Sequence, residues 1–267
     1  MQIIHRISER VDGQIQNQLS EIGIEVERGL VTFEIDESHP SWKKLEPMIS
    51  AWRSVDIVTT KFTANELKNA TYLRMAPRWH HGYPQPDGDF GYRTVSYNLA
   101  NFCSTCGIGK RQTSPIRLKG EPKWGRRHFL QLNWIFDEYF VRPEVWEDLF
   151  EPIGVGCLPV VDHRTGKDLR TVVQLDIMKT ESALQISDDQ PFDTCTHCGR
   201  KKYRAITRGP FPSFDVTPTS PIQKTKEYFG SGGSAWNAIV VSSDLFRQIS
   251  DRKLKGVHFI PCDRMTS

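Results

Sequence analysis

Long hydrophobic runs are missing from this sequence of 267 residues. No stretch approaches the roughly 18 apolar residues that a membrane-spanning helix needs. The beginning, MQIIHRISERVDG, has acidic side chains within its first twelve positions and lacks the apolar centre of a secretory signal peptide. We therefore expect a cytoplasmic protein. Because the cytoplasm is reducing, the six cysteines of the chain are expected to be thiols or metal ligands rather than disulfides.

A strong charge of either sign is also missing. The 35 Lys and Arg residues nearly balance the 32 Asp and Glu residues, so the net charge is +3. Nucleic-acid-binding domains usually carry a clearer basic excess. Hydrophobic residues make up 38% of the chain and charged residues 25%, which is typical of a globular protein. The composition predicts a folded protein but does not select its partner.

Several catalytic motifs are absent as well. The sequence has no Gly-x-Ser-x-Gly nucleophile elbow and no His-Glu-x-x-His helix. The stretch GSGGSAW at 230–236 is rich in glycine, but no Gly-Lys-Ser/Thr follows it and the next residues predict a strand, so we expect a flexible surface loop. His80 and His81 are adjacent and would point to opposite faces of a strand, which favours loop packing over a metal site. We predict a protein that is not an enzyme.

What the sequence does contain is a repeated cysteine motif. One pair is Cys103 and Cys106, the other is Cys195 and Cys198, and a glycine follows each pair. Two thiolates at this spacing bind one ion when the chain turns tightly between them, and glycine supplies the positive φ that such a turn needs. Four thiolates complete a tetrahedral zinc ion. The pattern predicts one structural zinc held by Cys103, Cys106, Cys195 and Cys198.

The zinc would join distant parts of the chain, because positions 106 and 195 are 89 residues apart. Two other interpretations of the cysteines are open: two unrelated reduced pairs, or a thioredoxin-like redox motif, although neither pair lies at a predicted strand-to-helix junction. His197, between the thiols of the second pair, is expected to be exposed. Cys157 and Cys262 have no second thiol nearby and are expected to be buried.

A basic run follows the second cysteine pair, and it consists of Arg200, Lys201, Lys202 and Arg204 around Tyr203. Cations interleaved with an aromatic ring are typical of nucleic-acid contacts. A zinc-ribbon-type nucleic-acid-binding protein that uses these four cations is therefore the alternative function. A run of this kind is also often no more than a solvated face.

The pattern of apolar residues predicts an α+β fold with two parts. Residues 1–85 contain strands at 30–36 and 54–62 and helices at 38–52 and 63–70. A loop rich in proline and glycine follows, and it marks a predicted boundary. We expect an N-terminal α+β unit at 1–85 and a larger zinc-clamped part at 86–267.

The larger part contains two similar segments, 136–160 and 236–262. Each predicts a strand, then a helix, then a second apolar stretch that ends in a proline and one further residue. Either a duplication or two generic strand–helix–strand units would explain the similarity. A shared strand order would favour duplication.

These features resemble the bacterial double-CxxCG family known from myxobacteria. The resemblance covers the chain from about residue 100 onward and rests on the two Cys-x-x-Cys-Gly copies and on the tail from IVVSSDLF to GVHF. The tail also looks like the ends of other polymorphic-toxin immunity proteins. Some members of the family are thought to be immunity proteins. The resemblance therefore implies a non-catalytic zinc-binding protein that neutralises a cognate bacterial toxin by protein–protein binding.

Overall fold

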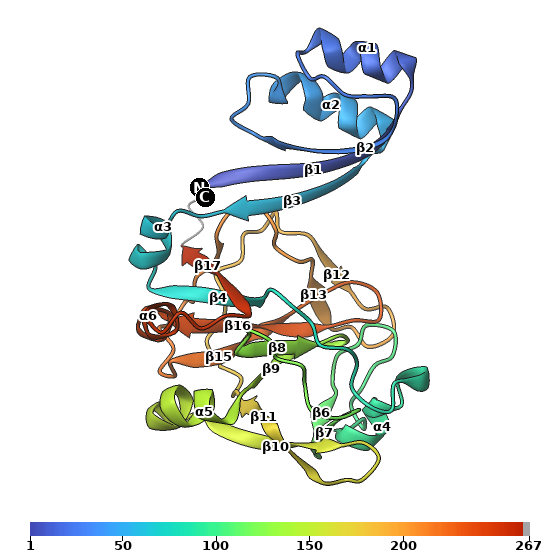
Figure 1. Ribbon diagram of the computed structural model, residues 1–267. Coiled ribbons are helices and arrows are strands. Elements are labelled where there is room, and N and C mark those ends of the chain that lie inside the picture. The colour runs from blue at the N-terminus through green and yellow to red at the C-terminus, as the bar shows by residue number, and fades with distance from the viewer. Residues whose placement is uncertain (264–267) are drawn as a thin grey trace. The chain divides into compact units, whose positions relative to one another are not determined.

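The computed structural model describes residues 1–263 and shows a mixed α+β protein, as the sequence predicts. The chain forms two compact units (Figure 1). The first contains Met1–Glu66 together with the short segment Ile206–Pro210, and the second contains the remaining described residues. Among the described helices, none has the length and apolar character that crossing a membrane requires.

The first unit is a three-stranded sheet with two helices packed against it. The strand order is β2-β1-β3, and β1 is antiparallel to both neighbours. The second helix buries Trp42, Leu45 and Ile49, which form one stripe at helical spacing. The strands and helices predicted between residues 30 and 70 are confirmed, whereas β1 and α1 are additional. The elements are β1 (Gln2–Val11), α1 (Gly13–Glu21), β2 (Gly29–Asp36), α2 (Trp42–Trp52) and β3 (Val55–Lys61), with α3 (Ala64–Asn69) following.

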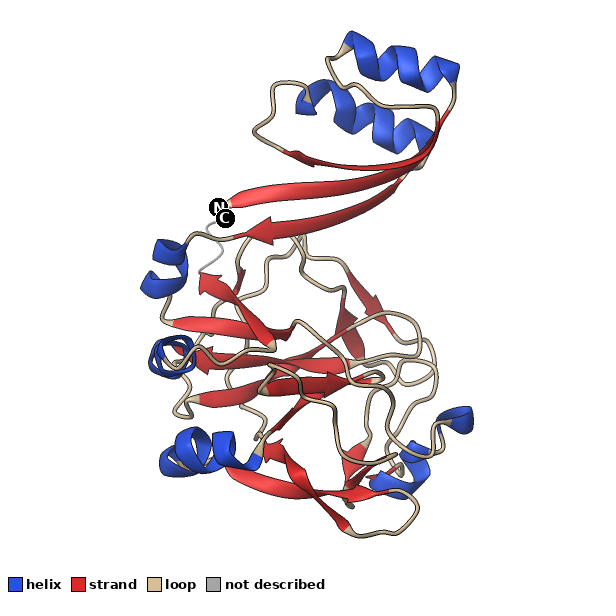
Figure 2. Cartoon of the chain, in the orientation of Figure 1, coloured by secondary structure: helices blue, strands red, loops and turns tan. Residues whose placement is uncertain are grey.

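The second unit contains two large sheets (Figure 2). Residues of both sheets contribute to one hydrophobic core. One sheet has the order β7-β10-β11-β9-β8, the other has the order β12-β13-β15-β16-β4-β17-β14, and β5 pairs with β6. The strands are β4 (Tyr72–Pro77), β5 (Tyr97–Asn98), β6 (Arg111–Gln112), β7 (Ile116–Leu118), β8 (Phe129–Leu132), β9 (Ile135–Val141), β10 (Gly156–Asp162), β11 (Asp168–Asp176), β12 (Phe192–Thr194), β13 (Lys201–Tyr203), β14 (Phe211–Pro212), β15 (Ile222–Phe229), β16 (Trp236–Ser242) and β17 (Val257–Asp263). The helices are η1 (Gly88–Phe90), α4 (Tyr92–Ser96), α5 (Pro143–Val145), η2 (Trp146–Phe150), η3 (Glu151–Ile153) and α6 (Ser243–Asp251).

The boundary between the units lies earlier than the predicted residue 85. Residues 67–85 belong to the second unit, because β4 is an inner strand of its larger sheet. This strand pairs with β16 on one side and β17 on the other, and Leu73 and Met75 lie in the shared core. The loop rich in proline and glycine therefore connects elements of one unit.

The same arrangement of five strands occurs in both large sheets. The order β7-β10-β11-β9-β8 corresponds to β14-β17-β4-β16-β15. In each set the first pair is parallel and the other three pairs are antiparallel. The two predicted strand–helix–strand segments are β9–α5–β10 and β16–α6–β17, and both pass over one intervening strand. A shared strand order is what a duplication predicts.

The residue pairing supports the duplication further. Paired residues across the first sheet are Phe129, Val141, Val173 and Pro159. The corresponding row in the second sheet consists of Ile222, Val241, Leu73 and Pro261. Both rows end in the proline that closes each predicted segment. The second unit is therefore built from two repeats, β4 to β10 and β11 to β17.

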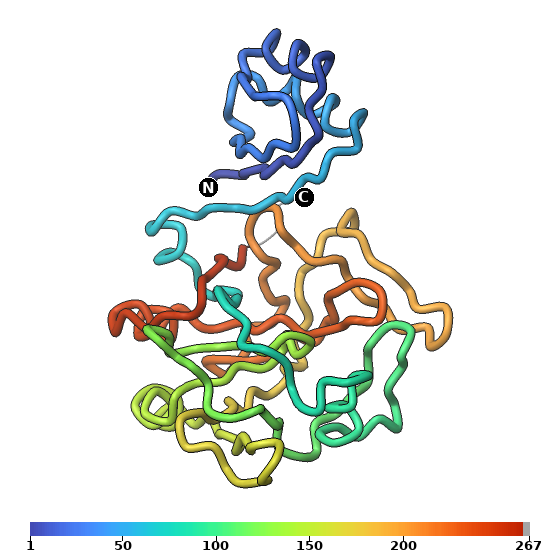
Figure 3. Tube along the Cα trace, turned by 45° about the vertical axis from the view of Figure 1, so that its right-hand side comes forward, coloured from blue at the N-terminus to red at the C-terminus, as the bar shows by residue number. Residues whose placement is uncertain are grey.

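The two repeats exchange one strand. Each strand of the first repeat has a counterpart seven strands later, but β4 lies in the sheet of the second repeat and β11 lies in the sheet of the first. The trace in Figure 3 shows the blue-green start of this unit running beside its red end. Each sheet is thus complete only with a strand from the other repeat.

Candidate metal centre

Four cysteine sulfurs lie together in the second unit, two from each repeat. The sulfurs of Cys103, Cys106, Cys195 and Cys198 are all within 4.8 Å of one another. The Sγ–Sγ distance is 3.8 Å between Cys103 and Cys195 and 3.6 Å between Cys106 and Cys198. A tetrahedral ion with metal–sulfur bonds of about 2.3 Å separates its sulfurs by roughly 3.8 Å. The cluster therefore fits a metal ion, whereas a disulfide needs about 2.05 Å.

Each cysteine pair lies in its own turn, and the two turns have the same hydrogen-bond pattern. The backbone N–H of Gly107 donates to the carbonyl of Cys103 (2.7 Å), and the N–H of Gly199 donates to the carbonyl of Cys195 (2.8 Å). The two glycines have φ values of 81° and 70°, as the sequence predicts. At Gly107 a Cβ atom would lie 2.4 Å from the carbonyl oxygen of Gly233, so this position also lacks space for a side chain. The turn is thus fixed by glycine on both sides of the cluster.

Backbone donors in these turns favour thiolates. The N–H of Cys106 donates to the Cys103 sulfur and lowers the pKa of that thiol to about 6. Backbone donors from Cys198 and His197 likewise lower the pKa of Cys195. Burial instead raises the pKa of Cys106 to about 12. Because the thiols differ in this way, a bound cation is what would bring all four into the ionised form.

A buried lysine accompanies the cluster. Lys202 is only 2% exposed, and its Nζ donates to the carbonyl oxygens of Cys106 (2.9 Å), Gly232 (2.6 Å) and Ser234 (3.0 Å). Within residues 1–263, no carboxylate lies within ion-pair distance of this ammonium group. A buried charge needs compensation nearby. Four thiolates around a divalent ion carry two negative charges and would supply it.

Of the four cations in the basic run, Lys201 and Arg204 are exposed, Arg200 is half-buried and Lys202 is buried. Lys202 is buried, and Arg200 donates from its guanidinium to the carbonyls of Asn101 (2.8 Å) and Ile108 (3.1 Å) beside the first cysteine pair. Lys201 lies over the rings of Phe192 and Tyr203, and Arg204 forms an ion pair with Asp193 at 3.0 Å. Strand β13 alternates its side chains, so Lys201 points outward and Lys202 inward. Arg200 and Lys202 therefore join the second repeat to the first, whereas Lys201 and Arg204 make contacts within the second repeat.

Other residues singled out from the sequence have structural surroundings. His197 is exposed and Cys262 is buried, as predicted, whereas Cys157 is only half-buried. The rings of His80 and His81 contact Phe136 and Trp79, in agreement with loop packing.

Residues 230–235 differ from the expected free surface loop. Their carbonyls accept from Lys202, and the loop packs against Gly107 of the first turn. The glycine run was the only signal of this role, because the contact involves segments more than 100 residues apart.

Comparison with known proteins adds no family. No protein-family model matches the sequence, and a search of curated proteins finds no match. The cysteine cluster shows where a metal could bind but does not identify a family.

Proposed function

We propose that Cys103, Cys106, Cys195 and Cys198 bind one zinc ion and that this ion is structural. The sulfur spacing carries the proposal, because it matches tetrahedral coordination from two separate turns. Four protein ligands leave zinc no open position for a substrate or an activated water. The ion would instead clamp the two repeats, each of which supplies half of the ligands.

Metal analysis of the full chain tests this proposal. Protein purified without added metal should contain about one equivalent of zinc, and Cys195→Ser should lose it. Cys157→Ser is the matched control, because Cys157 lies outside the cluster and should leave the zinc content unchanged. Iron in place of zinc, or a Cys195→Ser variant that keeps its metal and its stability, would refute the assignment.

The proposed molecular function is binding to another protein, without catalysis. The resemblance to the double-CxxCG family supports the more specific role of an immunity protein, which covers a cognate toxin in the bacterial cytoplasm. The closed ligand set agrees with a structural metal in such a scaffold. The nucleic-acid alternative has less support, because Lys202 is buried and Arg200 donates to backbone carbonyls beside the first cysteine pair.

Co-expression tests the immunity role. If the gene next to this one encodes a secreted toxin, cells that express both should survive, and the two proteins should copurify as a complex. A repair or transcription gene in that position, or no protection against the neighbouring toxin, would contradict the role. The zinc assignment would be unaffected, because its readout is metal content.

A further inference from the structure

The two repeats cross over between the sheets in the same way. Strand β11 lies between β9 and β10 of the first repeat, and β4 lies between β16 and β17 of the second. After β4 the chain moves to the sheet of its own repeat, where His80 pairs in parallel with Gln131 of β8. After β11 the chain crosses in the opposite direction, and Lys179 pairs in parallel with Lys224 of β15. Both crossings therefore end in the same kind of bridge at matching places.

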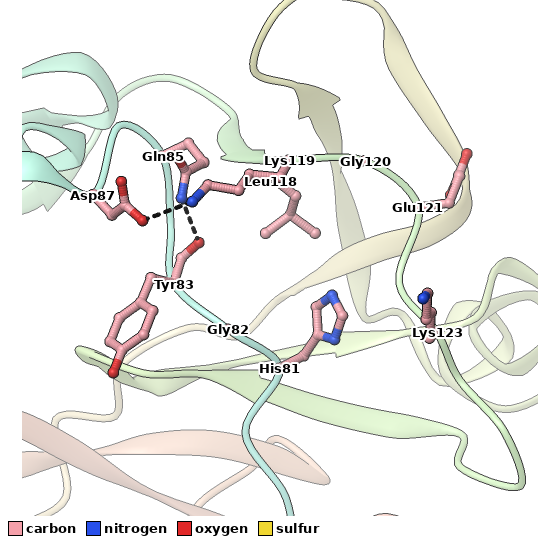
Figure 4. A pocket seen from close by; sticks show the side chains of 10 residues that line it. All are labelled: His81, Gly82, Tyr83, Gln85, Asp87, Leu118, Lys119, Gly120, Glu121 and Lys123. Carbon is pink, nitrogen blue, oxygen red and sulfur yellow. Dashed lines mark hydrogen bonds and ion pairs between the residues drawn. The ribbon is translucent and has the colours of Figure 1, made fainter.

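Beyond its crossing, the first repeat stays beside its own sheet. Side chains from residues 81–87 and from residues 118–123, which follow the edge strand β7, line one pocket of about 310 Å³ (Figure 4). In this pocket Lys119 pairs with Asp87 at 3.0 Å, and Figure 4 shows the two side chains reaching toward each other. The exchanged element of the first repeat is thus β4, the strand before the crossing.

Counterpart residues of the two repeats touch each other at the cysteine cluster. Cys103 and Cys195 are the first cysteines of their turns, and their sulfurs lie 3.8 Å apart. Cys106 and Cys198 are the second cysteines of their turns, and their sulfurs lie 3.6 Å apart. In a twofold arrangement, a residue meets its own counterpart only beside the rotation axis. The cluster therefore marks the axis that relates the repeats.

A second contact between counterparts lies near the start of β9 and β16. Val141 and Val241 occupy the same place in the two paired rows. Phe136 stands five positions before the first of these valines, and Trp236 stands five positions before the second. The rings of Phe136 and Trp236 pack edge to face, with their centroids 5.5 Å apart. Contacts between counterparts are the property that defines an isologous interface, the kind that joins two identical subunits.

The first and last strands of the second unit lie side by side. Strand β10, the last of the first repeat, is antiparallel to β11, and the turn at 163–167 joins the two. Strand β17, the last of the second repeat, is likewise antiparallel to β4, but no turn joins this pair. Pro261 pairs with Leu73 there, as Pro159 pairs with Val173 in the first sheet. The connection between the repeats is therefore a short addition to an arrangement that is already closed and symmetric.

We propose that the second unit is a strand-exchanged twofold dimer fused into one chain, and that the surface between its repeats fits a separate copy of the same repeat fold. Without its partner, each repeat has a gap between two inner strands, whose backbone groups then lack hydrogen-bond partners. Exchange of an identical element is a low-cost way to close both gaps at once. The turn at 163–167 then serves to hold the two halves at a high effective concentration. The inference rests on the strand pairing and not on the metal.

Cutting the connecting turn in the folded full chain tests the proposal. A protease recognition site is inserted between Thr165 and Gly166, which are both exposed, and the purified protein is cleaved after its circular dichroism spectrum is shown to match that of the parent. The two fragments should remain a one-to-one complex in size-exclusion chromatography. After unfolding in urea and removal of the urea in the presence of zinc, they should form the same complex again, with the spectrum of the uncut chain.

A cut inside a repeat is the matched control. The same site between Val216 and Thr217 also lies in an exposed loop, but it divides the second repeat after β14, and its fragments should not form the complex again after unfolding. Arg208→Ala removes an ion pair with Glu37 that also spans the first cut, and it should leave reassembly after that cut unchanged. Separation of the repeats, failure to reassemble, equal reassembly after both cuts, or loss of reassembly in Arg208→Ala would each overturn the proposal. Zinc content is measured separately, so the zinc assignment and this proposal can fail independently.

Discussion

Replacing Lys202 with methionine keeps a side chain of similar length but removes the buried ammonium group. Three carbonyl oxygens, those of Cys106, Gly232 and Ser234, then lose their donor. Each buried carbonyl left without a donor lowers the free energy of unfolding by about 1 kcal/mol. Removing the buried charge offsets part of this loss, because the ammonium group no longer has to be desolvated. We expect the free energy of unfolding to fall by about 2 kcal/mol. The cysteine cluster also loses its neighbouring positive charge, so its affinity for zinc should fall about 10–100-fold.

The neighbouring residue provides the control for this experiment. Lys201 belongs to the same strand, but it is exposed and lies over two aromatic rings. Lys201→Met should therefore change the stability by no more than about 1 kcal/mol and should not alter zinc binding. Urea titration measures the stability, and transfer of zinc to a chromophoric chelator measures the affinity. If the two methionine variants behave alike in both assays, the buried ammonium does not support the metal centre and the reasoning is refuted.

The two glycines of the cysteine turns should differ in their tolerance of alanine. Gly107→Ala should lower the free energy of unfolding by about 3 kcal/mol, because the new Cβ meets the Gly233 carbonyl. Gly199→Ala has open space around its Cβ and should lower it by about 1 kcal/mol, for the positive φ alone. Equal losses in thermal or urea unfolding would contradict the packing argument. Removal of zinc with a chelator should speed amide hydrogen exchange in both cysteine turns and in residues 230–235, while the amides of the first unit stay protected from exchange. A uniform loss of protection throughout the chain would argue against a local clamp. The parent should not bind mixed single- and double-stranded oligonucleotides at physiological salt, and changing Lys201 and Arg204 to glutamate should alter nothing; tight binding with a steep salt dependence would restore the nucleic-acid function.

The sequence contained the local information about the candidate metal centre. Cysteine spacing and a following glycine define each turn completely, so Cys103, Cys106, Cys195 and Cys198 could be selected without knowing how the intervening chain folds. The place of Lys202 could not be read in the same way, because a lysine within a basic run looks solvated. Only the alternation of side chains along a short strand shows which cation points inward, and that strand has three residues.

Long-range pairing limited the prediction of the fold. The helix of α2 follows from the spacing of its buried residues, and the two strand–helix–strand segments follow from their apolar patterns. No feature of β4 indicates that its partners are β16 and β17, whose paired residues lie 164 to 188 positions away. The loop after β4 has the composition of a domain linker, so the predicted boundary fell there. Composition describes a loop but does not say whether the strands on its two sides belong to one sheet.

The exchanged strands impose an order on how the protein can be made. The first sheet consists of β7 to β11, which follow one another closely along the chain, and it can close soon after β11 leaves the ribosome. The second sheet must wait, because β4 ends at Pro77 and its outer partner β17 begins at Val257, 180 positions later. At a synthesis rate of about 5–20 residues per second, the ribosome needs roughly 10–40 s to extend the chain from β4 to β17. Until then β4 cannot pair on both sides. During that interval Leu73 and Met75 can contact only the part of their core that the first sheet supplies, so the earliest strand of this unit depends on its last one.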